Sequence, residues 1–269
     1  MRFFRLLFIL VLIVTVTDNV MAQGTLSGAN TITTAVPFLG ITPDSRAGGM
    51  GDVGVGTTAD VSSQHWNPAK YVFMESDMGV GLSYSPWLRN LVDDINLAYL
   101  VAYKKLDDVQ SLSTSLRYFS LGDIIFTSEI GEFQGQQSPN EFAIDLAYSR
   151  LLSETWSGSV AVRYIRSDLT GGQLVNGVET HAGNSFAADV AFYYFNEFRR
   201  SRRDNSFSAG INIQNIGAKI SYTDGEVKDF IPTTLKLGAS YTMELDEYNS
   251  FSFSAEANKL LVPTPPADS

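Results

Sequence analysis

Six charged residues lie on the polar face of six segments in which apolar and polar residues alternate. They are Arg117, Asp145, Arg163, Asp189, Lys236 and Glu256. Their signs alternate along the series, so charges on neighbouring strands could pair, and isolated charges would be costly in a low-dielectric interior. Two interpretations stay open: a polar path for a solute, or a set of charge pairs that fills an interior. The sequence favours the second.

Other residue patterns give little support to catalysis or cofactor binding. The chain has no Cys, which removes thiolate metal sites, disulfides and Cys nucleophiles. Its two histidines, His65 and His181, have no second ligand at metal spacing, and no G-x-S-x-G motif is present. Residues 49–54 match G-x-G-x-x-G but lack the preceding buried strand that a dinucleotide site needs. We therefore expect no enzyme activity, no metal and no cofactor.

Nine alternating segments position these charges. Each places aliphatic and aromatic residues on one face and mostly Ala, Ser and Gly on the other, because successive side chains of a strand point to opposite faces. A soluble β-sandwich would also alternate, but the small residues favour a crowded interior over an open, charged surface. The segments lie near residues 79–84, 95–103, 112–118, 142–149, 156–164, 186–194, 207–214, 235–241 and 251–258.

The first 22 residues have the features of a secretory signal peptide. Arg2 and Arg5 precede an apolar run at residues 6–16, and Ala22 stands where cleavage would leave a mature chain from Gln23. The remaining sequence has no apolar run of about 18 residues, which a membrane-spanning helix would need. Only helices and closed barrels satisfy every backbone group inside a bilayer. The sequence therefore predicts an all-β, antiparallel transmembrane β-barrel whose apolar faces contact outer-membrane lipid.

The composition and the remaining organisation fit this prediction. Charged residues make up 18% of the chain and aromatic residues 12%, and the formal net charge of −10 argues against nucleic-acid binding. Residues 23–76 show no alternation, and we expect an N-terminal plug there, ahead of a partial barrel at residues 77–269. A short helix is expected at residues 60–70, with Asp60 as its N-cap and Asn67-Pro68 ending it.

Short and long connections alternate along the predicted strands, as periplasmic turns and outer loops of a barrel do. The short turns fall near residues 104–109, 151–155, 196–205 and 243–249, and the long loops near residues 86–93, 122–140, 167–184 and 217–233. Bacterial single-chain barrels have an even number of strands, so nine strands lead us to expect a C-terminally truncated fragment. The alternative is a further wall strand at residues 124–129 or 219–222, although both runs look more like loop hairpins.

One predicted short turn is strongly basic. It carries Arg199, Arg200, Arg202 and Arg203. Such a turn could dock an acidic partner, or it could simply be solvated, and the second interpretation is favoured.

Two N-terminal motifs resemble the start of the PorV family. They are Pro-Phe-Leu-Gly-Ile-Thr-Pro-Asp-Ser-Arg-Ala-Gly-Gly-Met-Gly-Asp at residues 37–52 and Gln-His-Trp-Asn-Pro-Ala-Lys at residues 64–70. Residues 232–241 and 257–259 look like the same family. The resemblance implies a FadL-like outer-membrane barrel of about fourteen strands with an N-terminal plug.

Within these motifs we expect polar side chains to fix the plug against the lumen, and glycines to permit close backbone approach. The plug motif comprises Asp44, Arg46, Gly48, Gly51, Asn67 and Pro68.

The resemblance further implies a non-enzymatic component of the type IX secretion system of Bacteroidetes. In that family the protein associates with the SprA translocon, receives cargo through the cargo's C-terminal domain, and delivers it to an attachment complex that contains the PorU sortase. Surface loops on a rigid wall suit binding, so we expect the loops at residues 122–140 and 167–184 to hold the cargo. The alternative is a FadL-like channel for hydrophobic solutes, which the lack of an internal Pro in the nine segments disfavours.

Overall fold

A computed structural model describes residues 32–87, 94–127, 130, 133–172, 174–175, 178–200, 203–224, 228–246 and 248–263. Within this part, Thr33–Val262 form one compact unit. The predicted signal peptide at residues 1–22 lies outside the described residues. None of the helices in the described part is long and apolar enough to cross a membrane.

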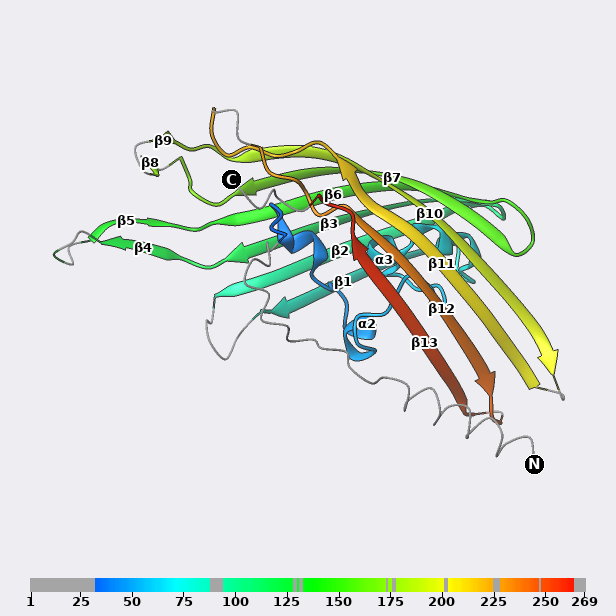
Figure 1. Cartoon of the computed structure of the whole chain (residues 1–269). Helices are drawn as coiled ribbons and strands as arrows, with labels where there is room; N and C mark the ends of the chain where they lie inside the picture. Colours follow the sequence, from blue (N-terminus) through cyan, green and yellow to red (C-terminus); the bar gives the residue numbers. More distant parts are fainter. Residues whose placement is uncertain are drawn as a thin grey trace, which may run out of the picture. The chain divides into compact units, whose positions relative to one another are not determined.

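The unit is built on one curved antiparallel sheet, which we call the wall (Figure 1). Its strands, in order, are β1 (Met78–Pro86), β2 (Ile95–Asp107), β3 (Gln110–Leu121), β6 (Asn140–Leu151), β7 (Trp156–Asp168), β10 (Gly183–Arg200), β11 (Arg203–Gly217), β12 (Thr234–Glu244) and β13 (Ser250–Leu260). Wall strands adjacent in the chain are adjacent in the sheet, and among the described residues β1 and β13 each pair with one strand only. The predicted all-β antiparallel fold with nine strands is confirmed.

The long connections carry small hairpins of their own. β4 (Ile124–Thr127) pairs with β5 (Phe133–Gln137), and β8 (Leu174–Val175) pairs with β9 (Val178–Glu179), each pair in a separate two-stranded sheet. Residues 219–222 contribute only an isolated bridge, between Ile220 and Asp229. Neither alternative run is therefore a further wall strand.

The predicted turn at residues 196–205 is wrong in extent. Here β10 and β11 continue pairing through Asn196↔Phe207 as far as Arg200↔Arg203. Polar and charged residues at the end of a long hairpin do not stop strand pairing, because the ladder uses backbone groups and the side chains stay in solvent.

The two faces of the wall differ in exposure, as the alternation predicts. Leu146 and Val162 are exposed, whereas their chain neighbours Ala147 and Ala161 are buried. The same alternation runs along β3, β6 and β7. We call the buried side the inner face and the exposed side the outer face. An apolar outer face is what contact with hydrocarbon requires.

β2 is an exception to the predicted orientation. The alternation put the row that includes Tyr99 and Tyr103 on the outer face, but both rings are buried on the inner face, and Leu100 is exposed on the other side. Tyr103 stacks on Tyr71 with ring centroids 4.8 Å apart. Both faces of β2 are apolar, so hydrophobic alternation alone cannot decide which face points inward.

Residues 33–77, which we call the inner segment, lie against the inner face. They contain η1 (Pro37–Gly40), α2 (Ser45–Gly49), α3 (Ser63–Trp66) and η2 (Pro68–Phe73). The helix predicted at residues 60–70 is too long, and Ser62 rather than Asp60 is its N-cap. Asn67 ends α3, as predicted, and it also caps η2, because its Oδ1 accepts a hydrogen bond from Ala69 N at 3.1 Å. Because the helical elements of the inner segment are short, most of its backbone carbonyls need hydrogen-bond donors from outside the segment.

A hydrophobic core forms where the inner segment first meets the long-loop end of the wall. Phe38 and Phe119 stack with ring centroids 6.5 Å apart. Ile165, Ile220 and Ile231 are buried in the same cluster, so the long loops contribute to the core. The cluster anchors the start of the inner segment.

Further along, the inner segment and the wall approach each other backbone to backbone. A Cβ at Gly56 would lie 2.4 Å from the carbonyl carbon of Gly238 on β12. Only glycine leaves room for such an approach.

We predict that Gly56→Ala lowers the free energy of unfolding by about 1–3 kcal/mol or more, because the added methyl group must push the two backbones apart. Urea unfolding of the detergent-solubilised protein measures the loss. Gly49→Ala is the matched control, since a Cβ there would meet nothing within 4 Å. Equal effects of the two substitutions would contradict the contact.

Candidate functional site

The inner face binds the inner segment through side chains that donate to backbone carbonyls. The donors and acceptors are Ser149 to Pro68 O (2.8 Å), Ser157 to Ala69 O (2.6 Å), Tyr193 to Thr57 O (2.9 Å), Ser208 to Gly56 O (2.7 Å), Asn212 to Trp66 O (2.8 Å) and Gln214 to His65 O. A buried carbonyl without a partner costs free energy. The small polar residues of the wall are therefore matched to the backbone of this one segment.

Asn67 links three parts of the site. Its amide nitrogen donates to Val55 O at 3.3 Å and to Phe192 O of β10 at 3.0 Å, while its oxygen caps η2. Phe192 itself points outward, so the contact uses only its backbone. One side chain thus ties two stretches of the inner segment to the wall.

Arg117 reaches from β3 into the inner segment. Its guanidinium donates to Leu39 O at 2.7 Å and to Phe38 O at 3.3 Å, and it also contacts His65 Nδ1. Burial, then the charge of Arg117, lowers the pKa of His65 well below its ordinary value. A neutral His65 can accept at Nδ1, which the contact with Arg117 requires.

Glu256 and Lys236 hold the middle of the inner segment. One carboxylate oxygen of Glu256 accepts hydrogen bonds from both Gly54 N and Val55 N, each at 2.8 Å. The Lys236 ammonium lies over the Trp66 ring, 4.6 Å from its centroid. The backbone amides of Gly54, the last residue of the G-x-G-x-x-G run, and of the following Val55 thus bind a carboxylate of the wall. A Cβ at Gly54 would clash with Trp66.

Three of the predicted interior charges form a buried cluster. Arg163 of β7 donates to Asp145 of β6 at 2.5 Å and to Asp189 of β10 at 3.0 Å. Asp189 also accepts from Asn215 N at 2.7 Å, and Arg163 contacts the Asn215 side chain. The structure thus brings together Asp145, Arg163 and Asp189, whereas the other three charges bind the inner segment.

The polar members of the plug motif act mainly within the inner segment. Asp44 caps α2 by accepting from Ala47 N at 2.9 Å, and it accepts from Trp66 Nε1 at 2.8 Å. Arg46 pairs with Asp60 and donates to Thr58. Within the described residues neither side chain is hydrogen bonded to the wall, whereas the Asn67 side chain and the Pro68 carbonyl are.

The expected close approach at Gly48 and Gly51 is wrong. A Cβ at Gly48 would meet only a methyl carbon of Thr42, at 3.9 Å, and one at Gly51 would meet nothing within 4 Å. Gly51 instead supplies a φ of +77°, a conformation that suits glycine. The close approaches occur at Gly56 and at Gly210, where a Cβ would lie 2.1 Å from Val55 O. Spacing along the chain gave no sign of which glycines would face another backbone.

The remaining sequence motifs lie away from this interface. His181 is exposed and forms an ion-pair contact with Asp224 at 3.4 Å. In the basic turn, Arg199 lies 3.8 Å from Asp204, and both are exposed. Among the described residues, no three His, Cys, Asp or Glu side chains gather as metal ligands would.

The missed residues of the site are the wall donors Ser149, Ser157, Ser208, Asn212 and Gln214. Their signal was present in the sequence as the small polar face of each strand. The partner was not, because hydrogen bonds to backbone carbonyls leave no trace in the identity of the accepting residue. Each of the six interior charges contacts another charge or the inner segment.

An antiparallel wall with an apolar outer face, and with a segment bound to its polar inner face, is the architecture expected for part of a transmembrane β-barrel, and among the described residues the sheet is not closed. The family described as "Type IX secretion system protein PorV" matches residues 25–267. The chain therefore belongs to the PorV family and is a component of type IX secretion, which confirms the resemblance in the N-terminal motifs. A comparison with curated proteins found no match.

We predict that Glu256→Ala destabilises the protein by about 1–3 kcal/mol, because it leaves two backbone donors without their acceptor. Urea unfolding gives the free energy, and hydrogen exchange of the peptide containing residues 54 and 55 should become faster. Glu256→Gln keeps one acceptor oxygen and should lose less. Glu154→Ala, at an exposed acidic residue of a short turn, is the control, and an equal loss there would contradict the role of Glu256.

Lys70 predicts a pH dependence of stability. Its buried ammonium donates to Thr57 Oγ1 at 3.1 Å, and burial lowers its pKa from 10.5 to about 8. Between these values the unfolded chain binds more protons than the folded protein, so stability rises with pH by roughly 3 kcal/mol in total. Below about pH 8 this increment is absent.

Lys70→Met should reduce the rise in stability, measured by urea unfolding from pH 7.5 to 10.5, by roughly 3 kcal/mol. Lys259→Met, at an exposed lysine of β13, should retain it. An unchanged slope in Lys70→Met would assign the pH dependence to other groups.

Proposed function

We propose that this protein is an outer-membrane adaptor of type IX secretion that binds secreted cargo through the cargo's C-terminal domain. It receives the cargo from a SprA-type translocon and passes it to a surface attachment complex with a PorU-type sortase. Membership of the PorV family supports the role in secretion. The exposed apolar side chains of the outer face support a multi-pass position in outer-membrane lipid.

The observation that carries the proposal is the β4–β5 hairpin, which projects beyond the long-loop end of the wall (Figure 1). Ile125, Ile130 and Phe133 are 61%, 81% and 68% exposed there. Large apolar side chains gathered on a projecting element mark a contact surface for another protein. This hairpin lies within the predicted cargo loop at residues 122–140.

The second predicted cargo loop, at residues 167–184, is braced by a neighbouring loop. Thr180 bridges to Thr223, and His181 N donates to Tyr222 O at 2.9 Å. Ser167 and Tyr222 are also hydrogen bonded, at 3.0 Å. Braced loops hold a binding surface in place, so less conformational entropy is lost when a partner binds.

The filled interior favours an adaptor over a channel. The inner segment is bound from both sides of the wall. Arg117 of β3 contacts it on one side, and Lys236 of β12 and Glu256 of β13 contact it on the other. A solute path along the wall would have to break these contacts. In the proposed role the inner segment is the plug that keeps the lumen shut while cargo binds outside.

One observation favours the alternative, a FadL-like channel for hydrophobic molecules. The β10–β11 register shifts between Ala188 and Val190, and an apolar groove of about 480 Å³ lies on the outer face nearby. Its lining includes Ile144, Val162 and Phe186. A lateral opening there would have to separate Asp189 from Asn215, which are hydrogen bonded at 2.7 Å. Fatty acid that co-purifies with the protein, in the absence of cargo, would support the channel.

We predict that the double substitution Ile125→Asp and Phe133→Asp lowers co-purification of cargo from outer membranes about tenfold, because it removes the apolar contact. Quantitative mass spectrometry of the purified full-length protein measures proteins that share the cargo C-terminal domain. Leu152→Asp, at an exposed apolar residue of a short turn at the opposite end, is the control. Undiminished cargo with the double variant would overturn the role of the hairpin.

A further inference from the structure

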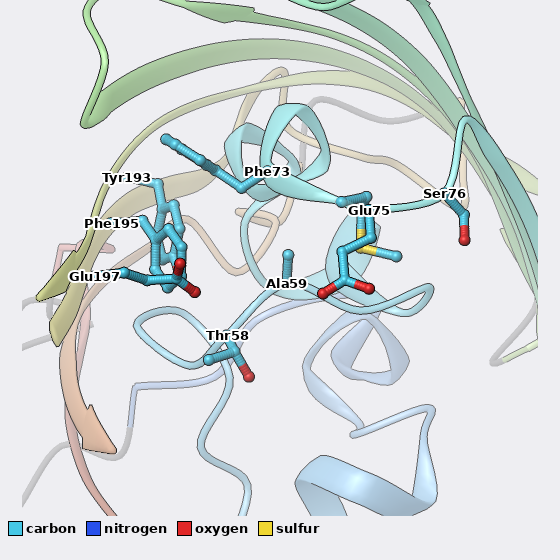
Figure 2. A pocket seen from close by; sticks show the side chains of 9 residues that line it. Thr58, Ala59, Phe73, Glu75, Ser76, Tyr193, Phe195 and Glu197 are labelled. Atoms are coloured by element: carbon cyan, nitrogen blue, oxygen red, sulfur yellow. The ribbon is translucent and has the colours of Figure 1, made fainter. Parts of the chain in front are cut away.

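A cavity of about 500 Å³ opens between the inner segment and β10, at the short-turn end of the wall (Figure 2). Tyr193, Phe195 and Glu197 line one side, from alternate positions of β10 that all point inward. Phe73, from the end of η2, extends toward these rings, and Glu75, from the residues that lead into β1, lines the other side. The cavity lies at the end of the wall opposite to the long loops, for which cargo binding is proposed.

The apolar part of the cavity is formed by aromatic side chains. Tyr193 and Phe195 stack with ring centroids 6.4 Å apart and planes within 10° of each other. Phe73 packs on both, at 5.7 Å from Tyr193 and 5.5 Å from Phe195. Tyr193 is further fixed by its hydrogen bond to Thr57 O at 2.9 Å. Tyr193 is fully buried and holds the half-buried rings of Phe73 and Phe195 in place, and these two rings present the aromatic surface that a ligand could contact.

The polar part of the cavity is negatively charged. Glu75 and Glu197 are exposed, and within the described part of the chain neither carboxylate has a hydrogen bond or an ion pair. The cations that touch the cavity's margin are engaged elsewhere: Arg46 pairs with Asp60 and donates to Thr58, and Lys105 donates to Met74 O at 3.3 Å. Among the described residues that line the cavity itself there is no Lys, Arg or His.

We propose that this cavity binds the guanidinium group of an arginine side chain, presented by a polypeptide partner at the short-turn end. Fixed aromatic faces and free carboxylates are the two features that recognise an organic cation. The cavity has room for a long side chain with its aliphatic stem against the rings. Two exposed carboxylates on opposite sides suit an extended, weakly hydrated cation better than a small metal ion, which needs a closely packed set of oxygen ligands.

This inference is independent of the proposed cargo binding, because it concerns the opposite end of the wall and another partner. The chain contains no Cys, so Ser76→Cys places a single thiol at the cavity margin of the full-length protein. Its rate of modification is measured with a cationic trimethylammonium-ethyl methanethiosulfonate and with the anionic sulfonatoethyl reagent. The probe ligand is acetyl-Gly-Arg-Gly-amide, and the neutral control peptide carries citrulline in place of Arg.

We expect the cationic reagent to react at least about tenfold faster than the anionic one at low salt, because the carboxylates concentrate cations. The Arg peptide should slow modification of the thiol, and the citrulline peptide should not. Glu75→Gln with Glu197→Gln should remove both effects, whereas Glu154→Gln, in another short turn, should leave them unchanged. Phe195→Leu should weaken protection by the Arg peptide several-fold while retaining most of the reagent preference.

Two results would overturn the proposal. One is equal protection by the Arg and citrulline peptides, or no protection by either. The other is an unchanged preference for the cationic reagent when both carboxylates are replaced. Both carboxylates are exposed, so their replacement by Gln should leave the fold intact. The reagent preference can also be measured in the Ser76→Cys protein without any second substitution, which gives a test that does not depend on the Gln variants.

Discussion

The whole fold depends on one constraint: the backbone carbonyls of the inner segment need hydrogen-bond donors. Its longest described element is the six-residue η2, so few of its carbonyls have partners within a helix of their own. The wall supplies those partners from Ser, Asn, Gln and Tyr side chains at the inward positions of β6, β7, β10 and β11. A polar inner face is therefore required by hydrogen bonding as well as by geometry, because each buried carbonyl without a donor would cost free energy.

The charged residues follow from the same requirement. Arg117 and Glu256 bind carbonyls and amides of the inner segment, and Lys236 lies over Trp66. The Asp145–Arg163–Asp189 cluster instead joins three wall strands and holds the β10–β11 bulge through Asn215. Buried charges persist where each is paired or hydrogen bonded, so these contacts fix the register of the segment against the wall. A filled and fixed interior leaves binding to the two ends of the molecule.

The two ends differ in chemistry. At the long-loop end, an apolar hairpin projects beyond the wall and the neighbouring loops are braced against each other. At the short-turn end, aromatic rings and two carboxylates that have no partner among the described residues surround a cavity. An apolar surface suits a folded domain, whereas an acidic aromatic cavity suits a single basic side chain. A protein that takes part in transport across a membrane can in this way address different partners at its two ends.

The sequence by itself determined the strands, the outer face of every wall strand except β2, and the family, because period-two alternation and the motifs at residues 37–52 and 64–70 are local properties. It also found Asn67 and the six interior charges, but not what they bind. Only the tertiary structure decided that β2 turns Tyr99 and Tyr103 inward, that Gly56 and Gly210 rather than Gly48 and Gly51 meet another backbone, and that Ser and Asn side chains of the wall serve carbonyls more than 80 residues away. Those outcomes depend on which surfaces meet across the interior, and a backbone carbonyl accepts a hydrogen bond whatever the identity of its residue.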